Sequence, residues 1–142
     1  MQATLKQFVS KSWPALLITI VVLGFIINFI THGSVQHPGK TTYANQCAIC
    51  HGENGEGIKV LVPPLMDADF ARNNIDSMPC WIKNGMSHAI VVNGQPYDQN
   101  MYGLELDEVQ IANVINYLSE EMLHTKRQVS SQWVKQQLKG CK

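Results

Sequence analysis

The segment Cys47-Ala-Ile-Cys50-His51 holds half of the four cysteines of this 142-residue chain within four positions and follows them directly with a histidine. On a helical turn, side chains at positions i and i+3 lie on the same side. The two sulfur atoms can therefore bind one group together, with the imidazole beside them. The pattern Cys-x-x-Cys-His is the attachment signature of c-type haem.

Three other uses of the cysteine pair compete with haem attachment. A thioredoxin-like dithiol requires a βαβ pattern, which this sequence does not display. A zinc site would add Cys80 and His88, but the spacing matches no common zinc finger. A structural disulfide between Cys47 and Cys50 leaves the histidine unexplained. One covalent haem c accounts for all three residues, with two thioethers to the cysteines and His51 as an iron ligand.

The N-terminal part contains an uncharged run, residues 14–30, which as a helix would cover about 25 Å of a hydrocarbon core of roughly 30 Å. Lys6 and Lys11 precede the run, whereas Lys40 is the only base in the ten residues after it. This bias favours a cytoplasmic N-terminus. We expect a membrane anchor in a bacterial cytoplasmic (inner) membrane, with the haem domain on the periplasmic, outer face. The competing interpretation is a cleaved signal peptide.

The net charge is zero because three regions cancel. Residues 1–40 carry +3, residues 41–121 carry −8, and residues 122–142 carry +5. The basic end is typical of a solvated tail, or of a segment that lies along anionic lipid or the acidic domain. Nucleic acid is excluded as a partner by topology, because the domain is expected outside the cell.

The sequence predicts four parts: a cytoplasmic N-terminus and transmembrane anchor, a short linker, a haem domain and a basic C-terminal extension. Their boundaries are residues 1–31, 32–39, 40–123 and 124–142. The linker extends no more than about 30 Å, which keeps the haem domain close to the membrane. A domain of this size is near the lower limit for a stable core, so a buried cofactor or a covalent crosslink is expected.

Helical patterns predict a mainly α domain. The first helix is expected from about Lys40 into the cysteine pair, and a second over residues 77–84, ending at Gly85. The last helix has Asp107 as its N-cap with Gln110 three residues on. Its apolar positions follow at helical spacing: Ile111, Val114, Ile115, Leu118 and Met122.

Strand signals are weak. Residues 91–97 predict a small Asn-Gly turn, and Pro96 within them argues against an extended sheet.

The sixth coordination position of the iron is either filled by a protein ligand or left open. Met122 and Met78 are expected in the core. Met101 differs, because it lies in an irregular polar loop, residues 97–103, just before the last helix. Such a loop can carry a thioether to the side opposite His51. We expect Met101 as the second iron ligand; the alternatives are Met86, Met66 and His88.

Together these motifs resemble the class I c-type cytochromes over about Gly39 to Leu123. Gly39 and Tyr43 resemble the small and aromatic residues of the N-terminal helix in that family, and Tyr117 resembles their aromatic partner in the C-terminal helix. The resemblance implies a small helical domain around the haem.

The same resemblance assigns further cofactor-binding residues. Pro63 and Leu65 resemble the loop whose proline carbonyl accepts the second ring N–H of the ligating histidine, a bond that fixes the tautomer. Met101 resembles the axial methionine. The family often has proline directly after this methionine, whereas Tyr102 follows it here.

The chain also extends past the usual end of the family, and this extension carries Cys141. The other spare thiol is Cys80, 61 positions earlier. In an oxidising compartment the two can pair, a crosslink worth about 4 kcal/mol in the chain-entropy model. The alternative is two unrelated thiols.

The resemblance implies one-electron transfer by a membrane-anchored, mono-haem cytochrome c, a subunit of a respiratory complex. Its partners would be redox proteins of that complex rather than a small-molecule substrate, and the subunit would not itself be an enzyme. The alternative functions are a haem enzyme or gas sensor with an open sixth iron position, and a scaffolding subunit whose haem only stabilises the fold.

Overall fold

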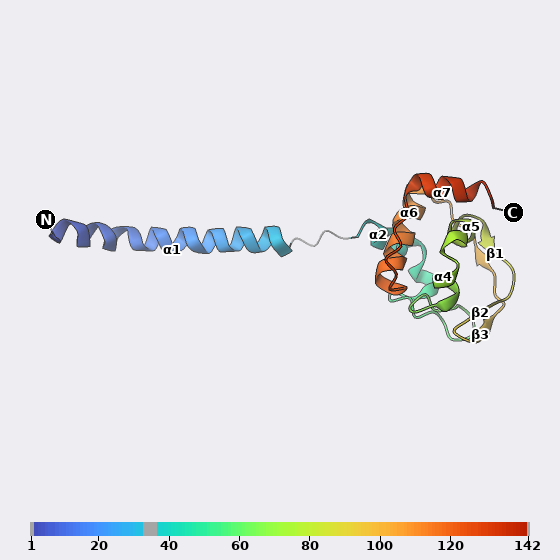
Figure 1. The fold of residues 1–142 in the computed structure, drawn as a ribbon. Coiled ribbons are helices and arrows are strands. Elements are labelled where there is room, and N and C mark those ends of the chain that lie inside the picture. Colours follow the sequence, from blue (N-terminus) through green and yellow to red (C-terminus); the bar gives the residue numbers. More distant parts are fainter. Residues whose placement is uncertain (1, 33–36, 142) are drawn as a thin grey trace. The chain divides into compact units, whose positions relative to one another are not determined.

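The computed structural model describes residues 2–32 and 37–141, which fall into two separate units divided between residues 35 and 36 (Figure 1). The first unit is one helix, α1 (Gln2–His32). The second unit contains all the other elements. The predicted linker falls partly on residues 33–36, which lie outside the described residues, as do Met1 and Lys142 at the two ends.

Helix α1 has the properties of a membrane span. Its residues Trp13–Ile30 are apolar, exposed and numerous enough to cross a bilayer. A signal sequence near an N-terminus can also meet these criteria of length and composition. The helix that the sequence predicts is thus present, and its role is taken up under the proposed function.

The second unit is mostly helical, as expected. Its helices are α2 (Pro38–Gln46), α3 (Ala48–His51), α4 (Asp69–Asn73), η1 (Ile75–Ser77), α5 (Met78–Asn84), α6 (Glu108–Tyr117), η2 (Leu118–Met122) and α7 (Ser131–Leu138). Its strands are β1 (Gly85–Met86), β2 (Ile90–Val92), β3 (Gln95–Tyr97) and β4 (Met101–Tyr102).

Helix α2 crosses helix α6, and the two helices form the centre of the core. Gly39 is buried at the crossing, where a Cβ atom would collide with the carbonyl oxygen of Asn113. Next to it, the rings of Tyr43 and Tyr117 lie 5.5 Å apart between centroids. Glycine therefore permits the close approach, and the two aromatic rings fill the space beside it.

The start of α2 differs from the expectation of about Lys40. Pro38 occupies the first turn, where its missing N–H costs nothing, and the Nδ1 atom of His37 accepts a hydrogen bond of 3.1 Å from the Gly39 N–H. The helix therefore begins two residues earlier. It is also interrupted at Cys47, where φ is −113°, and α3 follows as a separate short turn.

The predicted start of the last helix is confirmed. The Asp107 carboxylate accepts hydrogen bonds from the backbone of Val109 and Gln110, and the Gln110 side chain accepts one from the Asp107 N–H. This is a complete capping box. After α6 the chain continues through the wider turn of η2, which leaves Met122 buried, so the expected core position of this methionine is also confirmed.

Two short antiparallel strand pairs lie beside the helices. Strands β2 and β3 form a hairpin around Asn93 and Gly94, which both have positive φ, in agreement with the Asn-Gly turn signal. Pro96 is accommodated because this hairpin is a separate two-stranded sheet. Strands β1 and β4 form a second pair, which the sequence did not predict.

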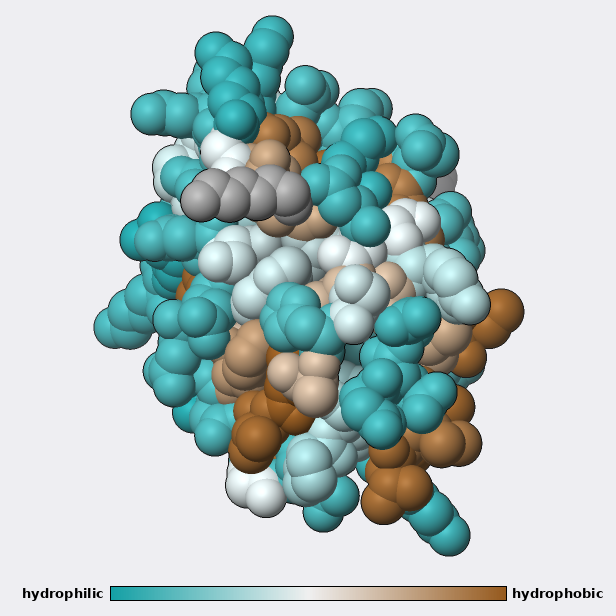
Figure 2. All heavy atoms as spheres, turned by 90° about the vertical axis from the view of Figure 1, so that its right-hand side faces the viewer, coloured by the Kyte–Doolittle hydropathy of each residue, from teal (hydrophilic) through white to brown (hydrophobic). Residues whose placement is uncertain are grey.

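The C-terminal extension packs against the rest of the second unit and contains helix α7, which the expectation of a solvated basic tail did not include. Val134 on α7 is fully buried, and a disulfide joins Cys80 on α5 to Cys141. The Asn116 side chain bonds both backbone groups of Val129, at 2.7 and 3.0 Å. Figure 1 shows α7 at the top of the unit, above α6 and α5, and the upper part of the surface in Figure 2 is mainly hydrophilic.

Candidate functional site

An apolar cavity of about 360 Å³ lies within the second unit, a size within the range of small-molecule and cofactor sites. Side chains from most elements of the unit border it. They include Cys47, Cys50, His51, Pro63, Leu65 and Met101, the six cofactor-binding residues predicted from the sequence. The fold therefore brings residues more than 50 positions apart in the chain to one site.

The cysteine segment forms one wall of the cavity. Because the chain turns from α2 into α3 at Cys47, the N–H of His51 donates to the Cys47 carbonyl at 2.9 Å. Cys47 is half-buried and Cys50 is exposed. Both cysteines border the cavity, and Cys50 is the more accessible of the two to solvent.

The imidazole of His51 is oriented by the opposite loop. Its Nδ1 atom lies 3.0 Å from the carbonyl oxygen of Pro63, so Nδ1 carries the hydrogen and donates it. This tautomer leaves the lone pair of Nε2 free for a metal. Burial lowers the pKa of His51, which keeps the ring neutral, although the bond to Pro63 acts in the other direction.

Glycine keeps the Pro63 loop close to His51. Gly57 has a φ of +69°, and its N–H donates to the His51 carbonyl at 2.8 Å. A Cβ atom on Gly57 would lie 2.5 Å from the Val62 oxygen and 2.8 Å from the Pro63 carbonyl carbon. Only glycine fits both the backbone conformation and the space.

The structure places three of the four candidates for the sixth ligand at this cavity. Met101 borders it from β4, Met86 from β1, and His88 from the segment that follows β1. Met66, by contrast, is not among the residues that border it in the described part of the chain.

The structure argues against the zinc site, because Cys80 is not available as its third cysteine ligand. Cys80 is bonded to Cys141, so it is not a free thiolate. Among the residues that the structure describes, no group of three or more His, Cys, Asp or Glu side chains is placed to hold a metal ion. The cysteine pair therefore has no partner set of the kind that zinc requires.

One aromatic pair at the cavity was missed by the sequence analysis. The rings of Phe70 and Trp81 stack with centroids 5.0 Å apart, and both border the cavity. Each belongs to a short helix, α4 or α5, whose length gives little periodicity to read. The signal that was available is the position of Trp81 directly after Cys80 in a helix expected to pack on the core.

The chemistry of the donor set fits a haem. A neutral imidazole and a thioether can ligate iron from an otherwise apolar cavity, and two cysteines stand where a porphyrin edge can be attached. Burial, and then the neighbouring Cys50, raises the pKa of the Cys47 thiol to about 11. A sulfur in this place is thus stable uncharged, as it is in a thioether.

The comparison with known families agrees with this geometry. Residues 36–120, more than half of the chain, match the family model described as "Cytochrome c". The chain belongs to the cytochrome c family. The expected mainly α, class I cytochrome c fold is confirmed, and a cytochrome c domain implies covalently bound haem c.

Two curated relatives of this cytochrome are named "Alcohol dehydrogenase (quinone), cytochrome c subunit", from Gluconacetobacter polyoxogenes and Komagataeibacter europaeus. Each is 33% identical to the chain over an alignment of 97 residues, and the alignment covers 64% of this chain. The chain spans about one fifth (20%) of the length of either relative. The likeness thus concerns a part of each relative and not its whole length.

Proposed function

We propose that this cytochrome is a membrane-anchored electron-transfer subunit with a single haem c. Cys47 and Cys50 would hold the haem through thioethers, and His51 and Met101 would ligate its iron from opposite sides. When bound, the haem supplies reversible one-electron oxidation and reduction. The observation that carries the proposal is the apolar cavity that gathers the Cys-x-x-Cys-His segment, the Pro63 carbonyl and Met101.

The residues of the chain have separate tasks in this proposal. The hydrogen bond from His51 Nδ1 to Pro63 fixes the imidazole and raises its basicity toward iron. Leu65, Phe70 and Trp81 line the cavity with apolar surface and exclude water. A dry site of fixed geometry limits the reorganisation that accompanies each change of charge.

Electrons would enter and leave at the side of the cavity that faces solvent. Cys50 and its neighbour Ile49 are exposed there, Ile49 with 84% of its surface accessible. A partner protein that covers this side would come close to Cys50, one of the two residues that would hold the haem. With His51 and Met101 both bound to the iron, no position would be left for a substrate, so the subunit would carry electrons and would not itself catalyse a reaction.

The anchor and the partners follow from α1 and from the relatives. We propose that α1 stays in the cytoplasmic membrane and holds the haem domain on the outer face. By the names of the relatives, a membrane oxidoreductase complex such as a quinone alcohol dehydrogenase is the proposed class of partner. The acidic middle region, with a charge of −8 over residues 41–121, favours a partner with a basic surface.

The haem and its ligands are tested on protein produced in a host with cytochrome c maturation. We expect colour that stays on the polypeptide after denaturation and acid-acetone extraction, one haem per chain, and a one-electron redox titration. The ferric protein should display the weak far-red sulfur-to-iron band and the ferrous protein should bind carbon monoxide poorly. Tight carbon monoxide binding would instead establish an open sixth position.

The anchor and the partners have a separate test. Full-length protein should stay with membranes after an alkaline carbonate wash and keep its N-terminus when the mature protein is sequenced. A mature chain that starts near residue 34 would identify a cleaved signal instead. Purification in mild detergent should recover an oxidoreductase together with the cytochrome, and recovery of the cytochrome alone would contradict a fixed subunit.

A further inference from the structure

Two methionines face the haem cavity from neighbouring strands. In the β1–β4 pair, Met86 stands directly opposite Met101, and Gly85 stands opposite Tyr102. Residues directly opposite in an antiparallel pair project to the same face of the ribbon, with Cβ atoms about 5 Å apart. Both methionines are half-buried and both border the cavity.

The strand pair is held in this register by its glycine. Gly85 has a φ of +80°, and a Cβ atom at this position would collide with the Met101 carbonyl oxygen. Gly103, directly after β4, makes a similarly close contact, because a Cβ atom there would lie 2.5 Å from the Lys83 carbonyl oxygen. The close contact of the two backbones thus keeps the backbone positions of Met86 and Met101 opposite each other even if one of the side chains changes rotamer.

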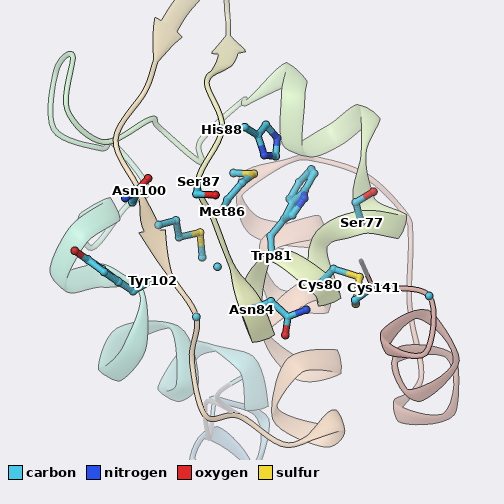
Figure 3. A pocket seen from close by; sticks show the side chains of 14 residues that line it. Ser77, Cys80, Trp81, Asn84, Met86, Ser87, His88, Asn100, Tyr102 and Cys141 are labelled. Carbon is cyan, nitrogen blue, oxygen red and sulfur yellow. A yellow bond between two sulfur atoms is a disulfide. The ribbon is translucent and has the colours of Figure 1, made fainter.

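Space for such a change lies next to the pair. Met86 and Met101 also border a second cavity, of about 610 Å³. In Figure 3 the side chains of Met86, Trp81 and His88 gather at one side of this cavity. Methionine has three rotatable bonds and a soft thioether, so it adapts to free space more easily than other apolar side chains.

We propose that Met86 is a reserve iron ligand, which supplies a second thioether to the sixth position when Met101 is not bound. The inference rests on the proposed function, in which Met101 is the resident ligand. Because the chemical type of the ligand does not change, the exchange would keep the position closed to carbon monoxide and other small ligands. A loss of Met101 would then not convert the carrier into a gas-binding haem protein.

His88 is the competing side chain. It follows Met86 by two positions and borders the same two cavities. An imidazole would also close the sixth position, but without the sulfur-to-iron band. The two possibilities are therefore separated by spectroscopy.

The test uses full-length holoprotein with the substitution Met101→Leu, alone and combined with Met86→Leu. We expect the single variant to keep the far-red sulfur band in the ferric state. The double variant should lack the band and bind carbon monoxide at least about tenfold more tightly, because a competing ligand lowers the fraction of open sites in the single variant. Met101→Leu combined with His88→Ala should behave like Met101→Leu.

Each other outcome overturns the proposal. If Met101→Leu alone lacks the band and binds carbon monoxide as tightly as the double variant, Met86 is not a ligand. If the band is lost but carbon monoxide is excluded until His88 is replaced, the reserve ligand is His88. If Met86→Leu alone abolishes the band, Met86 is the resident ligand, and the assignment of Met101 also fails.

Absence of the sulfur band from the unmodified protein would instead refute Met101 as the resident ligand in the proposed function, whereas the redox titration tests electron transfer separately. Haem content and circular dichroism verify that each variant is folded. Should Met101→Leu mature poorly, Met101→Ala takes its place, since its smaller side chain creates no overpacking.

Discussion

The carbonyl oxygen of Pro63 lies 3.0 Å from Nδ1 of His51, and this bond joins the Cys-x-x-Cys-His segment to a loop twelve residues further on. The loop reaches His51 because Gly57 passes close to the backbone of residues 62–64 with a positive φ. One glycine therefore determines how the proposed iron ligand is oriented.

The substitution Gly57→Ala should displace the Pro63 loop. We expect a loss of about 1–3 kcal/mol in the free energy of unfolding, from backbone strain and from the collision with the Val62 oxygen. A weaker bond to Pro63 makes His51 less basic, so it stabilises ferric iron less and the reduction potential should rise. Denaturant unfolding and a redox titration measure the two effects.

Gly94→Ala is the matched control. Gly94 also has a positive φ, +80°, but no atom lies within 4 Å of its ideal Cβ position. It should lose about 1 kcal/mol from strain and leave the potential unchanged. Equal potentials in both variants would show that the Pro63 bond does not tune the haem.

Alkaline stability should depend on Tyr43. Its hydroxyl donates to the Gly52 carbonyl at 2.6 Å, and burial raises its pKa above the ordinary value. The folded state thus keeps a proton that the unfolded chain loses above about pH 10, and stability should fall as pH rises through this range. Below pH 10 the contribution of this group is fully present.

The substitution Tyr43→Phe removes both the hydrogen bond to Gly52 and the titrating hydroxyl group. The variant should be less stable than the unmodified protein by about 1 kcal/mol at pH 7, from the lost hydrogen bond, and the difference should shrink and reverse above pH 10. Urea unfolding between pH 7 and 11 measures this. Tyr102→Phe, at a residue with 83% of its surface exposed, is the control, and a pH dependence shared by both variants would rule out Tyr43 as the source.

The disulfide between Cys80 and Cys141 should carry a large part of the stability of the domain. It closes a separation of 61 residues, for which the chain-entropy model gives about 4 kcal/mol. The double substitution Cys80→Ser and Cys141→Ser should lower the free energy of unfolding by that order. A phosphine reductant should bring the unmodified protein to the same value, because thioethers to haem are not reduced. A loss below about 1 kcal/mol would mean that α7 is held by packing alone.

Asn116 should hold the C-terminal extension independently of the disulfide. Its side chain amide satisfies both the N–H and the carbonyl of Val129, which is 8% exposed. Asn116→Ala leaves two buried backbone groups unpaired, and we expect a loss of about 2 kcal/mol or more. Hydrogen exchange should increase in residues 125–141. Asn45→Ala, at an exposed position of α2, is the control, and equal exchange in both variants would argue against this role.

Local sequence determined the features that depend on neighbouring residues. The Cys-x-x-Cys-His spacing, the capping box at Asp107 and the Asn-Gly turn are each contained within five positions, and each can be read directly. The apolar run in α1 is equally clear, because its length of 18 residues and its apolar composition are enough to predict a helix that can span a membrane. These are interactions whose geometry is fixed by the adjacent backbone.

Tertiary structure alone decided which distant residues meet. The stacking of Phe70 on Trp81, the register of Met86 opposite Met101 and the packing of α7 through Val134 depend on contacts between separate elements. Strands of two residues and a helix of five residues are too short to display a periodic pattern in the sequence. Which of these elements lie against each other is therefore decided by the packing around the cavity and the helix crossing. The sequence thus specified the attachment chemistry, whereas the folded chain decided what surrounds it, because packing acts between residues that are far apart along the chain.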